Sequence, residues 1–198
     1  MCDKKNYWDV FYYKEIPPQY PSTFSKYILS YIDDKNSLLD IGCGNGRDSL
    51  FFKENGFDVI SIDNAKSIDF LGDTNKFHVV DVIDTNFKVD VYYARFFIHV
   101  IKESMLNSFF ENLSNIMSKN SIFVFETRST KGITELEKKE TNFKSSVGEK
   151  HFRMLYSKKY IKTKLIKYFD VIHLIEENNV AIHKEDNPYV IRGIVKKI

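Results

Sequence analysis

Three glycines at alternate positions, directly after a short apolar segment, constrain this chain more than any other feature. Residues 38–41 read Leu-Leu-Asp-Ile, and Gly42, Gly44 and Gly46 follow them. A short apolar run bounded by turn residues is typical of a strand buried on both faces. The glycines let the backbone turn sharply and leave room for a ligand against bare main chain. The pattern predicts a strand that ends in a ligand-binding loop.

A helix is expected directly after this loop. Residues 48–55 carry the apolar Leu50, Phe51 and Phe52, and Gly56 stands where a helix C-terminus favours a left-handed residue. The positive N-terminal end of such a helix faces the loop. Strand, glycine loop and helix together favour a nucleoside-like ligand.

The rest of the chain alternates between strand-like and helical segments. Residues 103–118 have apolar side chains at steps of three and four, which predicts an amphipathic helix. Strands separated by helices imply right-handed crossovers and a mostly parallel sheet, whereas the last two strands should pair antiparallel. The expected strands are 38–41, 57–62, 77–80, 89–94, 122–125, 171–175 and 189–195, and the other expected helices are 65–71 and 157–166.

Composition indicates one domain over residues 1–198, with 43% hydrophobic and 28% charged residues. A net charge of +2 gives no support for a nucleic-acid partner, and no apolar run is long enough to span a membrane. The polar N-terminus argues against secretion. Two cysteines fit a reducing cytoplasm without a disulfide, and the ligands of a structural zinc site are lacking, so we expect a cytoplasmic protein with no metal.

Acidic residues follow two further expected strands. Asp63 lies about 20 residues past the glycine loop, where a carboxylate can accept the hydroxyls of a ribose. Asp81 can accept a hydrogen bond from an exocyclic amine while the Val82 amide meets a ring nitrogen, which suits adenine. Arg47 stands where the dinucleotide-binding motif needs its third glycine, so the loop pattern is G-x-G-x-G. Each aspartate taken alone also suits a solvated loop residue or a helix cap.

Residues 38–52 resemble motif I of the class I S-adenosylmethionine-dependent methyltransferases, and Gly-Cys-Gly-Asn-Gly-Arg-Asp-Ser-Leu is most similar to their small-molecule, tellurite-resistance-like branch. The resemblance implies an α/β, Rossmann-like seven-stranded sheet, mostly parallel, with helices on both faces and a C-terminal antiparallel pair. It also implies S-adenosylmethionine as cofactor and S-adenosylhomocysteine as product. The cofactor-binding residues it suggests are Asp40, Gly42, Cys43, Gly44, Asn45, Gly46, Arg47, Asp63, Asn64, Asp81, Val82, Arg95 and Phe96.

Charged residues follow the fourth and fifth expected strands, where ligands bind in open α/β sheets. His151 is our preferred general base, with His99 as the alternative, and Arg153 completes the catalytic set. Arginines here suit an acceptor that carries phosphate or carboxylate. Structural roles for both histidines, and ion pairs for the arginines, remain open, and His78, His173 and His183 are expected to be structural. The substrate-binding candidates are Tyr12, Tyr13, Arg95, Glu126, Arg128, His151 and Arg153.

Two segments are expected to shape the site. Residues 1–36 contain an aromatic stretch followed by a proline-stiffened turn, which suits a lid, although an N-terminal helix packed on the sheet fits equally well. This stretch is similar to methyltransferases associated with bacterial capsule and surface-glycan assembly. Residues 131–156 form a polar, helix-bearing insert expected over the active site.

The sequence therefore predicts an O-methyltransferase for a small anionic metabolite, such as a sugar phosphate, a nucleotide-linked sugar or a phosphoramidate of surface-glycan biosynthesis. A monomer or homodimer is expected, without nucleic-acid or membrane partners. An NAD-dependent oxidoreductase and a non-catalytic cofactor-binding module are the alternatives. Amino-methylation of DNA is disfavoured, because the fourth expected strand ends in Ala94-Arg95-Phe96-Phe97 and not in Asn-Pro-Pro-Tyr.

Overall fold

A computed structural model describes residues 7–8, 11, 18–32, 34–65, 77–79, 86–133, 142–143 and 151–198. Its helices are α2 (Thr23–Leu29), α3 (Arg47–Glu54), the 3-10 helix η3 (Ile98–Val100), α4 (Glu103–Ile116) and α5 (Lys158–Leu165). Its strands are β1 (Ser37–Ile41), β2 (Asp58–Asp63), β3 (Phe77–Val79), β4 (Val91–Arg95), β5 (Ile122–Arg128), β6 (Asn142–Phe143), β7 (His151–Phe152), β8 (Phe169–Glu177) and β9 (Val190–Lys197).

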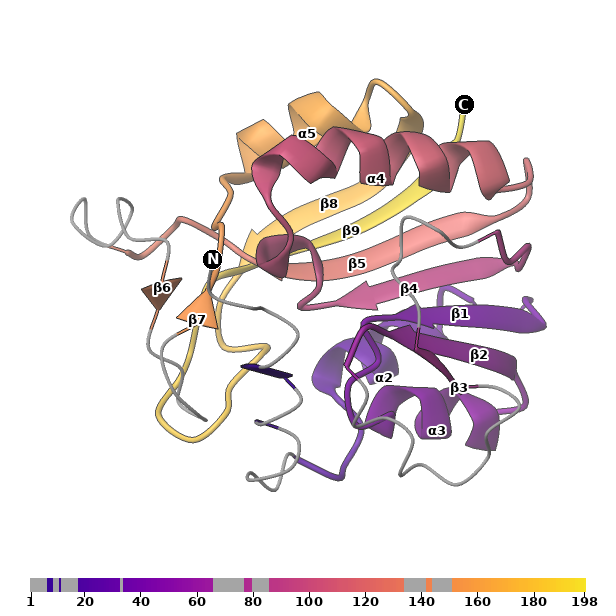
Figure 1. Cartoon of the computed structure of the whole chain (residues 1–198), viewed down its shortest axis with the longest axis horizontal. Coiled ribbons are helices and arrows are strands. Elements are labelled where there is room, and N and C mark those ends of the chain that lie inside the picture. Colours follow the sequence, from indigo (N-terminus) through magenta and orange to yellow (C-terminus); the bar gives the residue numbers. More distant parts are fainter. Residues whose placement is uncertain are drawn as a thin grey trace.

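The main sheet of the described chain has the strand order β3-β2-β1-β4-β5-β9-β8 (Figure 1). The pairs β1–β2, β1–β4, β2–β3 and β4–β5 are parallel. β9 runs antiparallel to both β5 and β8. The predicted Rossmann-like α/β fold, with a mostly parallel sheet and an antiparallel C-terminal pair, is confirmed.

Helices cover both faces of this sheet, each over its own apolar core. α2 and α3 lie on one face, where Phe24, Phe52 and Tyr93 pack together with ring centroids 5.3 Å and 5.0 Å from Tyr93. α4 and α5 cover the other face (Figure 1), and the buried Phe109 and Phe110 contact the sheet there. Alternation along the central strands sends successive side chains into opposite cores.

Sequence signals account for the ends of the helices. The Ser157 hydroxyl caps α5 by accepting from the Tyr160 amide at 3.2 Å, as the sequence predicted. Ser22 caps α2 in the same way, accepting from the Ser25 amide at 3.1 Å. Gly56 has a φ of +89°, the left-handed region expected after α3.

The structure differs from the expected elements in two places. β5 continues through Glu126, Thr127 and Arg128, beyond the expected end at residue 125, because these polar residues pair in register with β9. In the insert, the described residues form the antiparallel pair β6–β7. The expected helix at 65–71 lies outside the described residues except for Ala65.

In the aromatic stretch of the predicted lid, residues 7–13, the structure describes Tyr7, Trp8 and Phe11. Tyr7, Trp8 and Phe11 pack their rings against one another, with centroids 5.0 to 6.1 Å apart. Tyr12 and Tyr13 lie outside the described residues. Within the described part of the chain, no helix is long and apolar enough to cross a bilayer. The same residues contain no cluster of three or more histidine, cysteine or acidic side chains that could hold a metal ion.

Candidate active site

The glycine loop joins β1 to α3 at the carboxyl edge of the sheet. Gly42, Gly44 and Gly46 all have positive φ, at +73°, +56° and +70°. The Gly42 amide donates to the Ile62 carbonyl at 2.8 Å, which fixes the loop to the end of β2. A Cβ on Gly42 would lie 2.9 Å from Cδ2 of Phe97, so only glycine fits there without displacing that ring.

Asp63 ends β2 beside this loop. Its carboxylate accepts from the Gly44 amide and from the Ala65 amide, each at 2.9 Å. It is partly exposed, and the next residue, Asn64, is exposed. Asp63 therefore has the position expected of a ribose acceptor. Asp81 and Val82, the predicted adenine contacts, lie outside the described residues.

Asp40 sits beneath the loop and is buried. It accepts a hydrogen bond from the Ser49 hydroxyl at 2.6 Å, and Ser61 in turn donates to Ser49 at 2.9 Å. Burial raises the pKa of Asp40 to about 8, and the nearby carboxylates of Asp48 and Asp63 act in the same direction. Asp40 binds α3 to β1 through Ser49. Burial also raises the pKa of the Cys43 thiol, which fits a small turn residue and not a nucleophile.

Residues 18–22, which we call the strap, lie against the start of α3. The Asn45 side-chain amide donates to the Pro18 carbonyl at 2.9 Å, and Arg47 Nη1 donates to the Tyr20 carbonyl at 3.4 Å. The Ser22 amide donates to Asp48 Oδ1 at 2.7 Å. Alternate residues of the strap thus contact the loop and helix.

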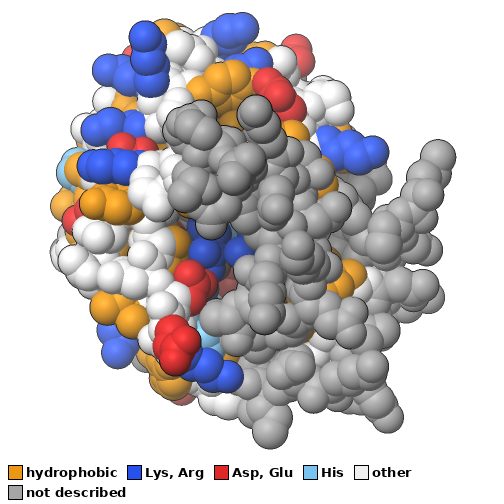
Figure 2. All heavy atoms as spheres, turned by 90° about the vertical axis from the view of Figure 1, so that its left-hand side faces the viewer, with side chains coloured by type: hydrophobic (Ala, Val, Ile, Leu, Met, Phe, Trp, Pro, Cys, Tyr) orange, Lys and Arg blue, Asp and Glu red, His pale blue; other side chains and the backbone are white. Residues whose placement is uncertain are grey.

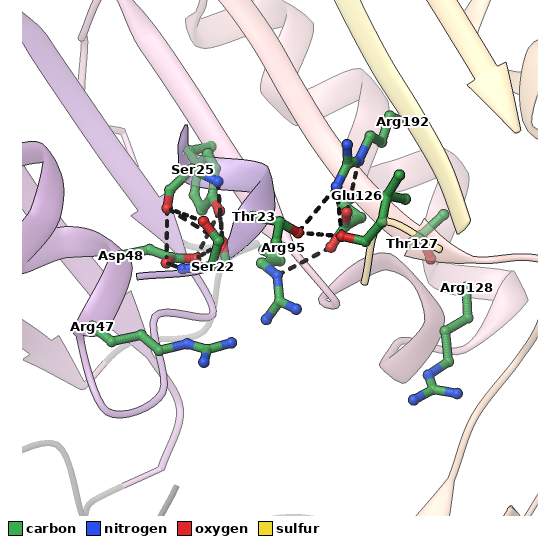
Figure 3. Close-up of polar contacts among 12 residues, drawn as sticks. Ser22, Thr23, Ser25, Arg47, Asp48, Arg95, Glu126, Thr127, Arg128 and Arg192 are labelled. Carbon is green, nitrogen blue, oxygen red and sulfur yellow. Dashed lines mark hydrogen bonds and ion pairs between the residues drawn. The ribbon is translucent and has the colours of Figure 1, made fainter. Parts of the chain in front are cut away.

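Asp48 is the buried anchor of the strap. Besides the Ser22 amide, it accepts from the hydroxyls of Ser22, Ser25 and Tyr93 at 2.8, 3.1 and 2.7 Å (Figure 3). A carboxylate can accept this many hydrogen bonds because it has two oxygens and no proton of its own to place. Asp48 therefore joins α2, α3 and β4 next to the glycine loop.

The buried carboxylate of Glu126 pairs with two arginines, one on each neighbouring strand. Arg95, Glu126 and Arg192 are register partners on β4, β5 and β9. Glu126 has no solvent exposure, and its Oε1 and Oε2 accept from Nε of Arg95 at 3.0 Å and Nε of Arg192 at 2.8 Å. Burial alone lowers the pKa of Arg95, but Glu126 raises it, and the net shift is upward. Arg95 is therefore charged at neutral pH.

Phe96, the residue after β4, has a left-handed backbone with φ +55°. This conformation is uncommon for a residue with a side chain and is maintained here by the Phe96 amide, which donates to the Glu126 carbonyl at 2.8 Å. The Arg95 guanidinium lies 4.2 Å from the Phe96 ring centroid, and that of Arg128 lies 5.4 Å from it. The Phe96 ring therefore forms cation–π contacts with two guanidinium groups.

Arg128 and Arg153 lie close together near the β8–β9 connection. Arg128 forms a two-pronged ion pair with Asp186. Arg153 is buried, and burial together with the charge of Arg128 lowers its pKa to about 10. His183 also lies here, and burial and the nearby cations Lys184 and Arg47 lower its pKa. The carboxyl edge of the sheet is thus rich in basic groups.

Figure 2 looks onto this edge of the sheet, and basic, acidic and histidine side chains lie next to one another in the middle of the view. The guanidinium groups of Arg47, Arg95 and Arg128 extend toward the same side of the molecule (Figure 3). Burial and the charge of Arg95 lower the pKa of Arg47.

His99 has the surroundings of a structural histidine. It is 2% exposed, and its Nδ1 accepts from the Arg128 amide at 3.3 Å and lies 3.2 Å from the Thr127 hydroxyl. An Nδ1 that accepts a backbone N–H leaves the ring proton on Nε2. These contacts favour a structural role for His99 over the role of general base. Only the backbone of His151, the preferred base, is described, in β7.

The predicted site residues gather in two groups. The loop residues, Asp40 and Asp63 lie at the ends of β1 and β2, whereas Arg95, Phe96, Glu126, Arg128 and Arg153 gather at the carboxyl ends of β4 and β5. The sequence analysis missed Asp48 and Arg192 and assigned His183 a structural role. No local pattern identifies Arg192 or Asp48, because their partners are 66 residues and 26 residues away in the chain.

Comparisons with known proteins identify the family and the fold. The family model of the tellurite resistance protein TehB matches residues 2–100. A comparison with curated proteins finds no significant match. The crystal structure of TehB from Haemophilus influenzae has a TM-score of 0.65 and 17% identity, over 87% of this chain and 62% of that one.

Two further solved structures share the fold. An S-adenosylmethionine-dependent methyltransferase from Clostridium acetobutylicum has a TM-score of 0.69 and 14% identity, over 88% of this chain and 91% of that one. The 1,6-didemethyltoxoflavin-N1-methyltransferase of Burkholderia thailandensis, solved with its substrate and S-adenosylhomocysteine, has a TM-score of 0.67 and 13% identity, over 87% and 76%. The predicted resemblance to the tellurite-resistance-like branch of the class I S-adenosylmethionine-dependent methyltransferases is confirmed. The chain belongs to the TehB family.

Proposed function

We propose that this TehB-family enzyme transfers a methyl group from S-adenosylmethionine to a small anionic acceptor bound beyond β4 and β5. The observation that carries the proposal is the adjacency of a bare glycine loop and a cluster of guanidinium groups at one edge of the sheet. The loop suits the cofactor and the arginines suit the anion.

The residues present fit the cofactor. Phe97 packs against the α-carbon of Gly42, where a side chain would displace the ring and distort the loop, and Asp63 presents a partly exposed carboxylate beside the loop. Carboxylates in this position accept ribose hydroxyls in Rossmann-like proteins. Bound S-adenosylmethionine would supply a methyl carbon whose bond to sulfur breaks, with the electron pair left on sulfur, as the acceptor's lone pair forms the new bond.

The basic residues would bind and orient the acceptor. Methyl transfer needs the attacking atom at near-attack distance, and fixing an anionic group in place supplies that orientation. We propose Arg95, Arg128 and Arg153, together with Tyr12 and Tyr13, as acceptor-binding residues, and His151 as the base that takes the proton of a hydroxyl acceptor. Residues 1–36 and 131–156 would close over the site within a single domain.

For the acceptor we propose a phosphate-bearing metabolite of surface-glycan assembly, methylated on oxygen, in a cytoplasmic setting. The resemblance of the aromatic N-terminal stretch to methyltransferases of that process supports this choice. The family's name provides a second candidate, the oxyanion tellurite, which the same arginines could bind.

Incubation with methyl-labelled S-adenosylmethionine tests the proposal. The acceptors are a sugar phosphate, a nucleotide-linked sugar, a phosphoramidate and tellurite, with a neutral sugar as the control. We expect label transfer to a phosphate-bearing acceptor or to tellurite and none to the neutral sugar. Transfer only to protein or RNA would contradict the small-molecule proposal.

The NAD-dependent alternative is tested by equilibrium binding of both cofactors. Arg47 replaces the third glycine of the dinucleotide motif and begins α3, where its side chain reaches the Tyr20 carbonyl. We therefore expect S-adenosylmethionine to bind and NADH to bind much more weakly. The opposite order of affinities would favour the oxidoreductase.

A further inference from the structure

We propose that Arg95 is the residue that binds the anionic group of the methyl acceptor, and that Glu126 and Phe96 are positioning residues that aim its guanidinium into the site. This inference rests on the proposed function and assigns distinct roles within the basic cluster.

Arg95 and Arg192 share the Glu126 carboxylate but use their remaining nitrogens differently. Arg192 uses its remaining nitrogens inside the protein: Nη2 donates to the Val180 carbonyl at 3.2 Å and to the Thr23 hydroxyl at 3.3 Å. Arg95 donates to Glu126 through Nε, and no hydrogen bond from its two terminal nitrogens is found among the described residues. These nitrogens point away from Arg192, and the guanidinium lies between those of Arg47 and Arg128 in the view of Figure 3.

Arg95, Glu126 and Arg192 do not balance one another in charge. One buried carboxylate lies between two guanidiniums, so the set of Arg95, Glu126 and Arg192 carries a net charge of about +1. Glu177 also approaches Arg192, whose Nη1 lies 3.5 Å from Oε1 of Glu177, so Arg192 contacts two carboxylates. The uncompensated positive charge therefore lies at the Arg95 end, where an anion would be stabilised.

Two neighbours fix the orientation of the Arg95 guanidinium. Glu126 fixes Nε, and the Phe96 ring lies beneath the guanidinium plane at 4.2 Å. The ring reaches this place because Phe96 has a left-handed backbone, and strained residues of this kind concentrate at functional sites. An arginine held at Nε and along one face keeps both terminal nitrogens available for a two-pronged contact with a phosphate or carboxylate.

The chemistry of the cofactor supports an anion at this point. Bound S-adenosylmethionine would add the positive charge of its sulfur to this basic edge of the sheet. An anionic acceptor would offset that charge together with the charge of Arg95. Glu126 itself would not contact the acceptor, because it has no solvent exposure and each of its oxygens accepts from an arginine.

The test measures binding of inorganic phosphate by calorimetry at saturating S-adenosylhomocysteine. Arg95→Lys keeps the positive charge but loses the two terminal nitrogens that could make a two-pronged contact, and we expect it to weaken phosphate binding at least tenfold. Glu126→Gln should weaken it several-fold without changing the affinity for S-adenosylhomocysteine, and Phe96→Leu should also weaken phosphate binding several-fold. Arg192→Lys is the matched control on the same carboxylate, and we expect a lower melting temperature with phosphate affinity within about twofold of wild type.

The outcomes separate this inference from the proposed function. Unchanged phosphate affinity in Arg95→Lys, or no measurable phosphate binding by the wild type, would overturn the role of Arg95 while leaving cofactor binding intact. Failure of the wild type to bind S-adenosylhomocysteine would instead refute the proposed function. Glu126 is buried, so Glu126→Gln is measured only if the variant folds. If it does not fold, Phe96→Leu tests the positioning of the Arg95 guanidinium with the Glu126 carboxylate in place.

Discussion

Replacing Gly42 with alanine tests the glycine loop by comparison with the same replacement at Gly56. Both glycines have a left-handed φ, +73° and +89°, which costs an L-residue about 1 to 2 kcal/mol. At Gly56 nothing lies within 4 Å of the new Cβ. At Gly42 the new Cβ would lie 2.9 Å from Cδ2 of Phe97, a ring that packs 5.4 Å from Phe109 and cannot move freely.

Overpacking of this kind costs roughly 1 to 3 kcal/mol, so Gly42→Ala should destabilise by about 2 to 5 kcal/mol and Gly56→Ala by about 1 to 2 kcal/mol. In a domain of this size these losses lower the melting temperature by roughly 4 to 20 °C for Gly42→Ala and roughly 2 to 8 °C for Gly56→Ala. Thermal and urea unfolding, followed by circular dichroism, measure both variants.

Cofactor affinity separates loop function from stability. We expect Gly42→Ala to weaken S-adenosylhomocysteine binding at least tenfold, because the displaced ring and loop alter the cofactor cradle. Gly56→Ala, at the opposite end of α3, should bind as the wild type does. Equal losses of stability in the two variants, or full affinity in Gly42→Ala, would refute the reasoning about Phe97.

Three further substitutions test the packing and the buried charges. Gly193→Ala places a Cβ 2.3 Å from Cε1 of Phe125 and should cost about 1 to 3 kcal/mol in urea unfolding; if Phe125→Leu in the same chain recovers none of it, the contact is not the cause. Asp48→Ala leaves buried hydroxyl and amide donors unsatisfied, so we expect a loss of about 3 to 5 kcal/mol, against less than about 0.5 kcal/mol for the exposed Asp34→Ala. The folded-state pKa of Asp40, about 8, lies above its unfolded value of 3.8, so its ionisation destabilises the fold progressively as pH rises from about 4 through 8. Asp40→Asn should therefore flatten the decline in melting temperature between pH 6 and 9, and parallel curves for variant and wild type would contradict the raised pKa.

The sequence predicted the loop and the sheet because their signals are local. Glycine spacing, apolar runs and the Ser157 cap each depend on neighbouring residues. The extension of β5 could not be predicted, because Glu126 and Arg128 at a strand end resemble a polar loop. Their burial depends on Arg95 and Asp186, which lie 31 residues and 58 residues away along the chain. Long-range ion pairs of this kind are visible only in the folded protein.

The most direct test of the account is the calorimetric titration of S-adenosylhomocysteine into the wild type and two aspartate variants of β2. Asp63 ends β2 beside the glycine loop, whereas Asp58 begins the strand and is exposed. We predict one-to-one binding by the wild type and by Asp58→Asn, and binding weakened at least tenfold in Asp63→Asn, a loss of about 1.4 kcal/mol or more. No binding by the wild type, or equal affinity in all three proteins, would contradict a cofactor site at the carboxyl ends of β1 and β2.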